Sequence, residues 1–280
     1  MSPRETVLID PHDLRRRIGA GDCPALLDVR WRLDQPDGHA AYLQGHLPGA
    51  VYVSLEQELS DHARGGLGRH PLPTGEAIQA AARRWGIRRG QPVVVYDDWN
   101  RAGSCRAWWV LTAAGLTDVR ILDGGLSGWT AAGGDLQTGP VQVPGGDVAV
   151  YHPDLYTGAR PTLTAADVEA SRVDTLLDAR AGERFRGEVE PVDPVAGHIP
   201  GAGNLPSTSM LDADGRFLPP ADLAALVQGL ELASAGVYCG SGVTASVVVA
   251  GLSALGVDAA LFPGSWSQWS GEGRRAQQGN

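Results

Sequence analysis

Cys239 has the sequence surroundings of a cysteine that performs chemistry. The segment GVYCGSGVTAS places it at the end of an expected strand, and a helix is expected to begin five residues later, at about Thr244. Gly240 and Gly242 allow the loop between them unusual dihedral angles, so that its N–H groups can turn inward around an anion. These donors and the helix amino terminus favour a thiolate over a thiol, and they suit an anionic persulfide equally well. We therefore predict that Cys239 takes up and gives away sulfur.

The other two cysteines have no such context. Cys105 lies inside a helical stretch rich in tryptophan and is interpreted as structural, and Cys23, in an amino-terminal turn, is assigned no role. Three cysteines do not build a disulfide framework. The amino terminus lacks the apolar segment of a secretory signal, so we expect a cytoplasmic protein with free thiols.

A cysteine before a loop and a helix is also typical of tyrosine phosphatases. Those enzymes place an arginine six residues after the cysteine, where its guanidinium forks onto phosphate oxygens. Ala245 stands at that position, and residues 240–245 contain no charged side chain. The sequence therefore argues against a phosphatase.

Composition sets the broad class of the protein. The 280 residues suffice for two domains, and 43% hydrophobic residues can form real cores. The net charge of −9 argues against nucleic acid or an anionic membrane as a partner, although a local arginine can still bind a small anion.

Four sequence blocks occur twice in the same order. Because their spacing is nearly constant, they indicate two copies of one domain of about 130 residues. The predicted domains are residues 1–135 and 161–274, joined by a linker rich in Gly and Pro at 136–160, and the polar tail from 271 is expected to be disordered. The blocks are LLDVR (26–30) and LLDAR (176–180), GHLPGA (45–50) and GHIPGA (197–202), VVVYD (93–97) and GVYC (236–239), and ILDGGLSGW (121–129) and LFPGSWSQW (261–269).

Strand-like and helical patterns alternate within each copy. This alternation predicts α/β domains, each with a mainly parallel sheet flanked by helices, whose ligands bind at the carboxyl ends of the strands. The clearest predicted strands are 92–97 and 235–239, together with 119–125 and 257–265, which each run from a strand into a turn. The clearest predicted helices are 104–116 and 244–256.

Four motifs together resemble the tandem-domain rhodaneses and 3-mercaptopyruvate sulfurtransferases, over essentially the whole chain. The resemblance implies two rhodanese-like domains, a silent first one and a second whose cysteine forms a persulfide, with no metal or organic cofactor. It also implies a small anionic sulfur donor, and a thiol, thioredoxin or cyanide as acceptor. The repeat agrees, because Asp97 falls opposite Cys239. The motifs are CGSGVTA (239–245), DARxxxRFRG (178–187), GHIPGA (197–202) and LDGGLSGW (122–129).

The resemblance also assigns the donor site. Arg184 matches the family arginine that binds the donor's anionic group, and Asp178 matches the acidic residue opening that block. Mercaptopyruvate-preferring relatives carry a second arginine where this chain has Val192, whereas thiosulfate-preferring ones carry basic residues after the cysteine. The donor therefore stays open between thiosulfate and 3-mercaptopyruvate. The active loop is expected to hold the transferred sulfur through Gly240, Ser241, Gly242, Val243 and Thr244.

Two further interpretations stay open. His46 and Asp37 fall where relatives place a proton relay with Ser241, but His198 repeats His46 in the other copy, which favours a structural role in the fold. The chain could also be a sulfur-binding or regulatory module without turnover, although the intact loop and Arg184 argue against this.

Overall fold

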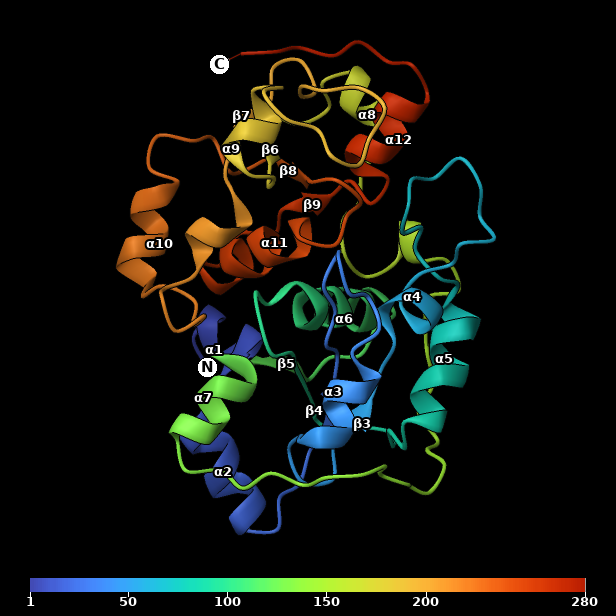
Figure 1. The fold of residues 1–280 in the computed structure, drawn as a ribbon, viewed down its shortest axis with the longest axis vertical. Coiled ribbons are helices and arrows are strands. Elements are labelled where there is room, and N and C mark those ends of the chain that lie inside the picture. The colour runs from blue at the N-terminus through green and yellow to red at the C-terminus, as the bar shows by residue number, and fades with distance from the viewer. Residues whose placement is uncertain (280) are drawn as a thin grey trace.

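The computed structural model describes residues 1–279, which form two lobes stacked end to end (Figure 1). The first lobe contains a five-stranded parallel sheet with the order β1-β5-β4-β2-β3. The second contains a four-stranded parallel sheet with the order β7-β6-β8-β9. The predicted α/β class with parallel sheets is confirmed. The strands are β1 (Leu8–Ile9), β2 (Ala25–Asp28), β3 (Val51–Tyr52), β4 (Val93–Tyr96), β5 (Val119–Leu122), β6 (Thr175–Asp178), β7 (Gly203–Asn204), β8 (Ala235–Tyr238) and β9 (Ala260–Leu261).

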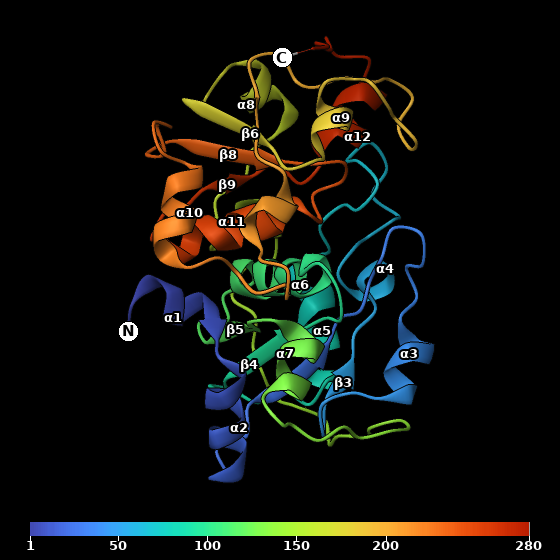
Figure 2. The ribbon, with the colours of Figure 1, turned by 60° about the vertical axis from the view of Figure 1, so that its left-hand side comes forward.

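Helices cover both faces of each sheet (Figures 1 and 2). Those of the first lobe are α1 (Pro3–Val7), α2 (Pro11–Gly19), α3 (His39–Gln44), α4 (Leu55–Glu58), α5 (Gly75–Arg84), α6 (Ala102–Ala113) and α7 (Gly125–Ala131). Those of the second are α8 (Ala165–Glu169), α9 (Gly182–Phe185), α10 (Pro220–Leu226), α11 (Ala245–Ala254) and α12 (Ser265–Gly271), with short 3₁₀ turns η1 (Leu155–Thr157) and η2 (Ser207–Met210).

The strand expected at 257–265 is much shorter in the structure. The cause is the end of α11, where Gly256 takes a positive φ of 86° and the Val257 N–H bonds back to the Leu252 carbonyl. This hydrogen-bonded helix cap uses the first residues of the segment, so only β9 pairs with the sheet.

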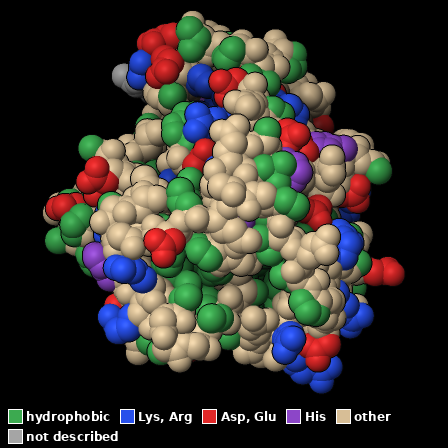
Figure 3. Space-filling model, turned by 60° about the horizontal axis from the view of Figure 1, so that its bottom comes forward, with side chains coloured by type: hydrophobic (Ala, Val, Ile, Leu, Met, Phe, Trp, Pro, Cys, Tyr) green, Lys and Arg blue, Asp and Glu red, His purple; other side chains and the backbone are tan. Residues whose placement is uncertain are grey.

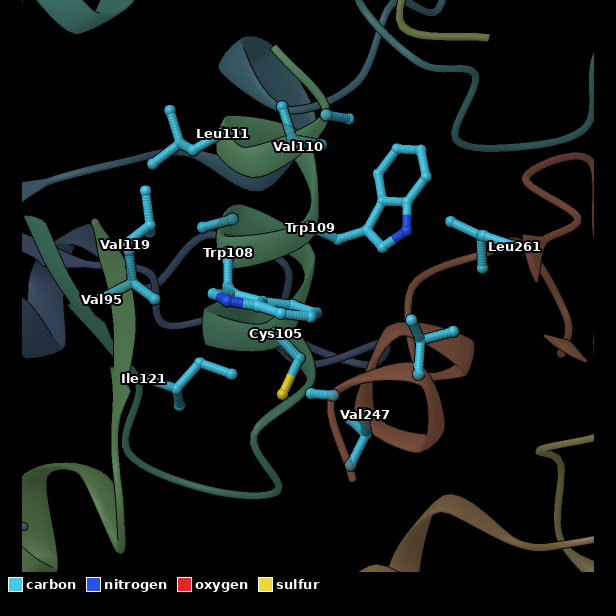
Figure 4. Close-up of a cluster of buried hydrophobic side chains, with 14 of the residues drawn as sticks. Val95, Cys105, Trp108, Trp109, Val110, Leu111, Val119, Ile121, Val247 and Leu261 are labelled. Atoms are coloured by element: carbon cyan, nitrogen blue, oxygen red, sulfur yellow. The ribbon is translucent and has the colours of Figure 1, made fainter. Parts of the chain in front are cut away.

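The two lobes meet along α6 and α11, which lie side by side in both ribbon views (Figures 1 and 2). Both helices are buried on almost every side, as expected for helices that separate two sheets. Figure 4 shows Cys105 and Trp109 on α6 facing the second lobe, toward Val247 and Leu261. Burial raises the pKa of the Cys105 thiol well above its ordinary value, which fits a structural role.

The repeated histidines lie in matching positions. His46 forms an antiparallel bridge with Gln137, and His198 forms one with Gln277. The carboxyl-terminal tail is therefore packed against the second lobe up to the last described residues, which corrects the expectation of a disordered tail; residue 280 lies outside the described residues.

The predicted absence of membrane and nucleic-acid partners concerns the helices and the surface charge. None of the helices in residues 1–279 has the length and apolarity of a membrane span. On the face drawn in Figure 3, acidic and basic side chains are interspersed rather than gathered by sign.

Candidate active site

The active loop begins directly after β8. Cys239 is 1% exposed, and its sulfur accepts a hydrogen bond of 3.2 Å from the Gly242 N–H. Gly242 has a φ of 78°, and a Cβ atom there would lie 2.5 Å from the Pro263 carbonyl oxygen. Only glycine fits this position without strain, and its amide points at the sulfur as a result.

Hydrogen bonds from the first residues of α12 hold the backbone of the loop in place. The Ser265 hydroxyl accepts the Cys239 N–H at 3.1 Å, while the Trp266 N–H donates to the Cys239 carbonyl and the Ser267 N–H to the Gly240 carbonyl. Ser265 adopts a φ of 52°, which is rare outside glycine. The hydrogen bonds around its side chain offset this strain, so Cys239 sits in a rigid frame.

Several amides of the loop have no hydrogen-bond partner among the described residues. The N–H groups of Gly240, Ser241, Val243 and Thr244 make no hydrogen bond with any residue in 1–279. Unsatisfied N–H groups near a buried sulfur are the donors that a persulfide requires.

The first lobe shows what this kind of loop can hold. The strand registers match Tyr96 with Tyr238, so Asp97 occupies the place of Cys239. One Asp97 oxygen accepts the N–H groups of Trp99 and Arg101, the counterparts of Ser241 and Val243, at 3.1 and 3.3 Å. The other accepts the Ser104 N–H and hydroxyl. A carboxylate thus fills the cradle in the first lobe. In the second lobe the N–H groups of Ser241 and Val243 are unbonded, whereas Ser246, the counterpart of Ser104, donates to the carbonyls of Val243 and Gly242.

Ser241 is hydrogen-bonded to residues other than those predicted for a relay. Ser241 Oγ lies 2.7 Å from Nδ1 of His70, whose Nε2 lies 3.1 Å from Oε1 of Glu56. Trp31 donates to the same carboxylate at 2.6 Å. Glu56 and His70 belong to the first lobe, so the chain Ser241–His70–Glu56 crosses the domain interface.

The protonation states of this chain follow from its surroundings. Burial opposes the charge of Glu56, but hydrogen bonds from His70 and Trp31 outweigh it and lower the pKa of Glu56 to about 2. Burial lowers the pKa of His70, more than Glu56 raises it. A carboxylate only accepts hydrogen bonds, so His70 Nε2 carries its proton, and Nδ1 accepts from the Ser241 hydroxyl.

His46 and Asp37 lie elsewhere, which corrects the predicted relay. His46 stacks on Tyr42 and its Nδ1 lies 2.8 Å from the Tyr42 carbonyl. His198 repeats this arrangement on Phe185, as the structural interpretation predicted. Asp37 is at the surface and accepts from the His39 N–H at 2.9 Å.

Asp178 also serves the fold rather than the loop. Both of its oxygens accept from Arg180, with a shortest distance of 2.6 Å, and Asp28 and Arg30 form the same pair in the first lobe. Because the pair occurs in both copies, it explains the acidic residue of LLDxR without a bound donor.

Arginines approach the loop from both lobes. A Cβ atom on Gly240 would lie 3.7 Å from Nη1 of Arg184 and 3.1 Å from Nη2 of Arg69. Arg184 is where the sequence predicted it, and it pairs with Glu190 at 2.6 Å and Asp193 at 3.4 Å. Arg69 comes from the first lobe and was not predicted.

Arg106 lies beneath the loop in a fully buried position. It donates to the carbonyls of Leu59, His70 and Gly242. Burial lowers its pKa to about 10, so it stays charged at neutral pH. This side chain joins the active loop to the relay segment.

The residues missed by sequence reasoning share one segment. Glu56, Arg69 and His70 lie in or beside residues 59–74, a loop between α4 and α5 that reaches the second lobe (Figures 1 and 2). An irregular loop of this length is often functional, and its content of His, Arg and Gly was the available signal.

Both lobes of the chain are similar to known proteins. The Rhodanese-like domain family matches residues 10–132 and 161–272. The putative thiosulfate sulfurtransferase SseB of Mycobacterium tuberculosis is 63% identical over 278 residues, covering 98% of each chain. The probable 3-mercaptopyruvate sulfurtransferase of Pseudomonas aeruginosa is 43% identical over 279 residues, covering 96% of each. The crystal structure of SseA from Escherichia coli has a TM-score of 0.81 at 32% identity, covering 94% of this chain and 99% of that one.

Proposed function

The chain belongs to the rhodanese family and is a sulfurtransferase, and on this premise we propose that Cys239 carries the transferred sulfur as a persulfide. The observation that supports this most directly is the set of unbonded loop amides around the Cys239 sulfur, in a cradle whose counterpart holds the Asp97 carboxylate. We further propose that residues 161–274 form the catalytic domain, that residues 1–135 form a catalytically inactive domain, and that residues 136–160 link the two.

The first half-reaction is a displacement at sulfur. With thiosulfate, the Cys239 thiolate attacks the outer sulfur, the S–S bond breaks, and its electron pair leaves with sulfite. The enzyme keeps a Cys–S–S⁻ anion, and no proton is needed. The free N–H groups of Ser241 and Val243 and the hydroxyl of Thr244 lie in the loop that would hold this anion.

3-Mercaptopyruvate makes a further demand that this site can meet. Here the C–S bond breaks, the electron pair goes to carbon as an enolate, and the donor's thiol proton must end on the methyl group of pyruvate. Ser241 is hydrogen-bonded to neutral His70, which is hydrogen-bonded to ionised Glu56, and this chain can transfer the proton. Thiosulfate needs no such relay. The presence of the chain Ser241–His70–Glu56 therefore supports 3-mercaptopyruvate as the better donor.

In the second half-reaction, a thiophilic acceptor attacks the outer sulfur of the persulfide. Cys239 leaves as a thiolate, and cyanide becomes thiocyanate or a thiol becomes a new persulfide. A cellular thiol or thioredoxin would fill this role in the cytoplasm, where reduced thiols are abundant.

The test is an intact mass of the protein after exposure to each donor without acceptor. We expect a gain of one sulfur atom that is lost when cyanide is added. Cys239→Ala should show no gain, whereas Cys23→Ala, which removes an exposed thiol, should gain sulfur as the wild type does. Wild-type protein that gains no sulfur from either donor would refute the mechanism, and the ratio of kcat/KM for the two donors decides the preference.

A further inference from the structure

Arg69 reaches the active loop next to Arg184. Both guanidinium groups lie near Gly240, the residue after the cysteine, and both pair with Asp193, although they come from different domains. The sequence has no arginine at the second donor-binding position that the resemblance implies, where the exposed and uncharged Val192 stands. Arg69 therefore supplies, from the first domain, a second cation beside the loop.

The position of Arg69 is set by its own backbone. Its N–H donates to the Ser267 hydroxyl at 3.1 Å, which ties residues 68–69 to α12 across the interface. Gly68 has a φ of 86°, and a Cβ atom there would lie 2.5 Å from the Gly264 carbonyl oxygen. This close approach requires glycine, and it holds Arg69 over the active loop.

Two nitrogen atoms of the Arg69 guanidinium have no hydrogen-bond acceptor among the described residues. Nη1 pairs with Asp193. Nη2, the atom nearest Gly240, has no hydrogen-bond partner among residues 1–279, and Nε is buried without one. A buried donor without a partner is costly, and a bound oxyanion would relieve that cost. Two adjacent N–H groups on one guanidinium are also the arrangement that binds carboxylate or sulfonate oxygens in pairs.

Asp193 already marks an anion position between the arginines. One of its oxygens pairs with Arg69 and the other lies 3.4 Å from Arg184, and its side chain is 3% exposed. Burial raises the pKa of Asp193, against the opposing effect of Arg69. A carboxylate therefore sits between two cations at some cost, and a donor anion would compete with it for the same guanidinium groups.

We propose that Arg69 is the second arginine of the donor site, and that it and Arg184 together bind the donor's carboxylate or sulfonate across the domain interface. This rests on the sulfur-transfer function proposed above. The shared chemistry is an oxyanion beside the transferred sulfur, and thiosulfate and 3-mercaptopyruvate are the two sources to be compared.

The test measures donor binding apart from turnover. Calorimetric titration of Cys239→Ala with each donor gives an affinity for an enzyme that cannot react. Adding Arg69→Gln should weaken binding about tenfold to a hundredfold, as expected for the loss of a charge-assisted contact. Arg186→Gln is the matched control, because Arg186 lies at the surface and pairs with Glu188. It removes the same charge and should change the affinity by less than about twofold.

Two further variants guard against a purely structural effect. Arg69→Lys should restore part of the affinity, and Asp193→Asn should tighten binding because it removes the competing charge. Unchanged affinity in Arg69→Gln, or no binding of either donor to Cys239→Ala, would overturn the proposal. If binding depends on Arg69 while the wild type gains no sulfur, the proposed reaction is wrong and the anion site stands.

Discussion

Ser241 Oγ lies 2.7 Å from Nδ1 of His70, so a side chain of the first domain contacts the loop that follows Cys239 in the second. His70 is 5% exposed, and it is oriented by an ionised carboxylate on its far side. This geometry is that of a hydroxyl, an imidazole and an acid acting as a unit, and its purpose can be tested through the two donors.

Replacing His70 with Gln should affect the donors differently. We expect kcat with 3-mercaptopyruvate to fall about a hundredfold or more, since a positioned proton donor is lost, and kcat with thiosulfate to fall less than about tenfold. His62→Gln is the control, because the exposed His62 contacts the other oxygen of Glu56 at 2.9 Å. Equal losses with both donors would show that His70 only supports the loop.

Acid should inactivate the relay when His70 takes up a proton. Burial lowers the pKa of His70 below its ordinary 6.5, so the rate with 3-mercaptopyruvate should rise with pH through an apparent pKa below that value. This acid limb should be absent with thiosulfate in the same buffers, and a shared limb would assign it to another group.

The same group makes stability depend on pH. A histidine with a lowered pKa takes up its proton more readily when unfolded, so stability should fall as pH drops from 6.5 through the folded pKa. Glu56 adds a second loss as pH drops from 4.5 toward about 2. Urea midpoints between pH 4 and pH 8 should decline toward acid in the wild type and less in His70→Gln; equal slopes would contradict this assignment.

Asp97→Ala should destabilise the first domain without abolishing activity. The change leaves Arg101, whose side chain is 1% exposed and lies 3.2 Å from Asp97, as a buried charge without its partner. We expect a loss of about 3–5 kcal/mol in unfolding free energy. Asp98→Ala removes an aspartate whose nearest arginine contact, to Arg32, is 3.4 Å, and should cost under about 1 kcal/mol. Urea unfolding of both variants measures the difference.

Gly242→Ala should abolish persulfide formation. A Cβ atom there meets the Pro263 carbonyl oxygen at 2.5 Å, so the loop must move and the amide turns away from the Cys239 sulfur. Gly201→Ala shares the positive φ but has open space around it, so it should cost about 1–3 kcal/mol of strain and keep activity. Intact mass after donor exposure separates the two variants, and sulfur uptake by Gly242→Ala would show that this amide is dispensable.

What the sequence predicts well is local or repeated. The strand before Cys239, its glycine loop and α11 follow from short patterns, and the repeat identifies the Asp97 counterpart. Arg184 was placed by resemblance, and it does lie beside the loop.

The residues that sequence reasoning missed act across the interface. His70 and Ser241 are 171 positions apart, and no periodic pattern relates them. The resemblance made His46 a relay candidate, while its repeat at His198 favoured a structural role, and both histidines form matching β-bridges in their own copies. Repetition therefore identified fold elements correctly, whereas unrepeated residues such as His70 and Arg69 lie beside the loop of Cys239.

The filled cradle of the first domain limits what a single substitution could do there. A Cβ atom on Gly125 would lie 1.6 Å from Nη1 of Arg101, so this loop is built around an internal ion pair with Asp97. A cysteine at position 97 would leave that arginine buried without its carboxylate. His70 and Arg69 contact Ser241 and Asp193 of the second domain, so each copy uses side chains of the other. The two halves of the repeat are therefore not interchangeable modules.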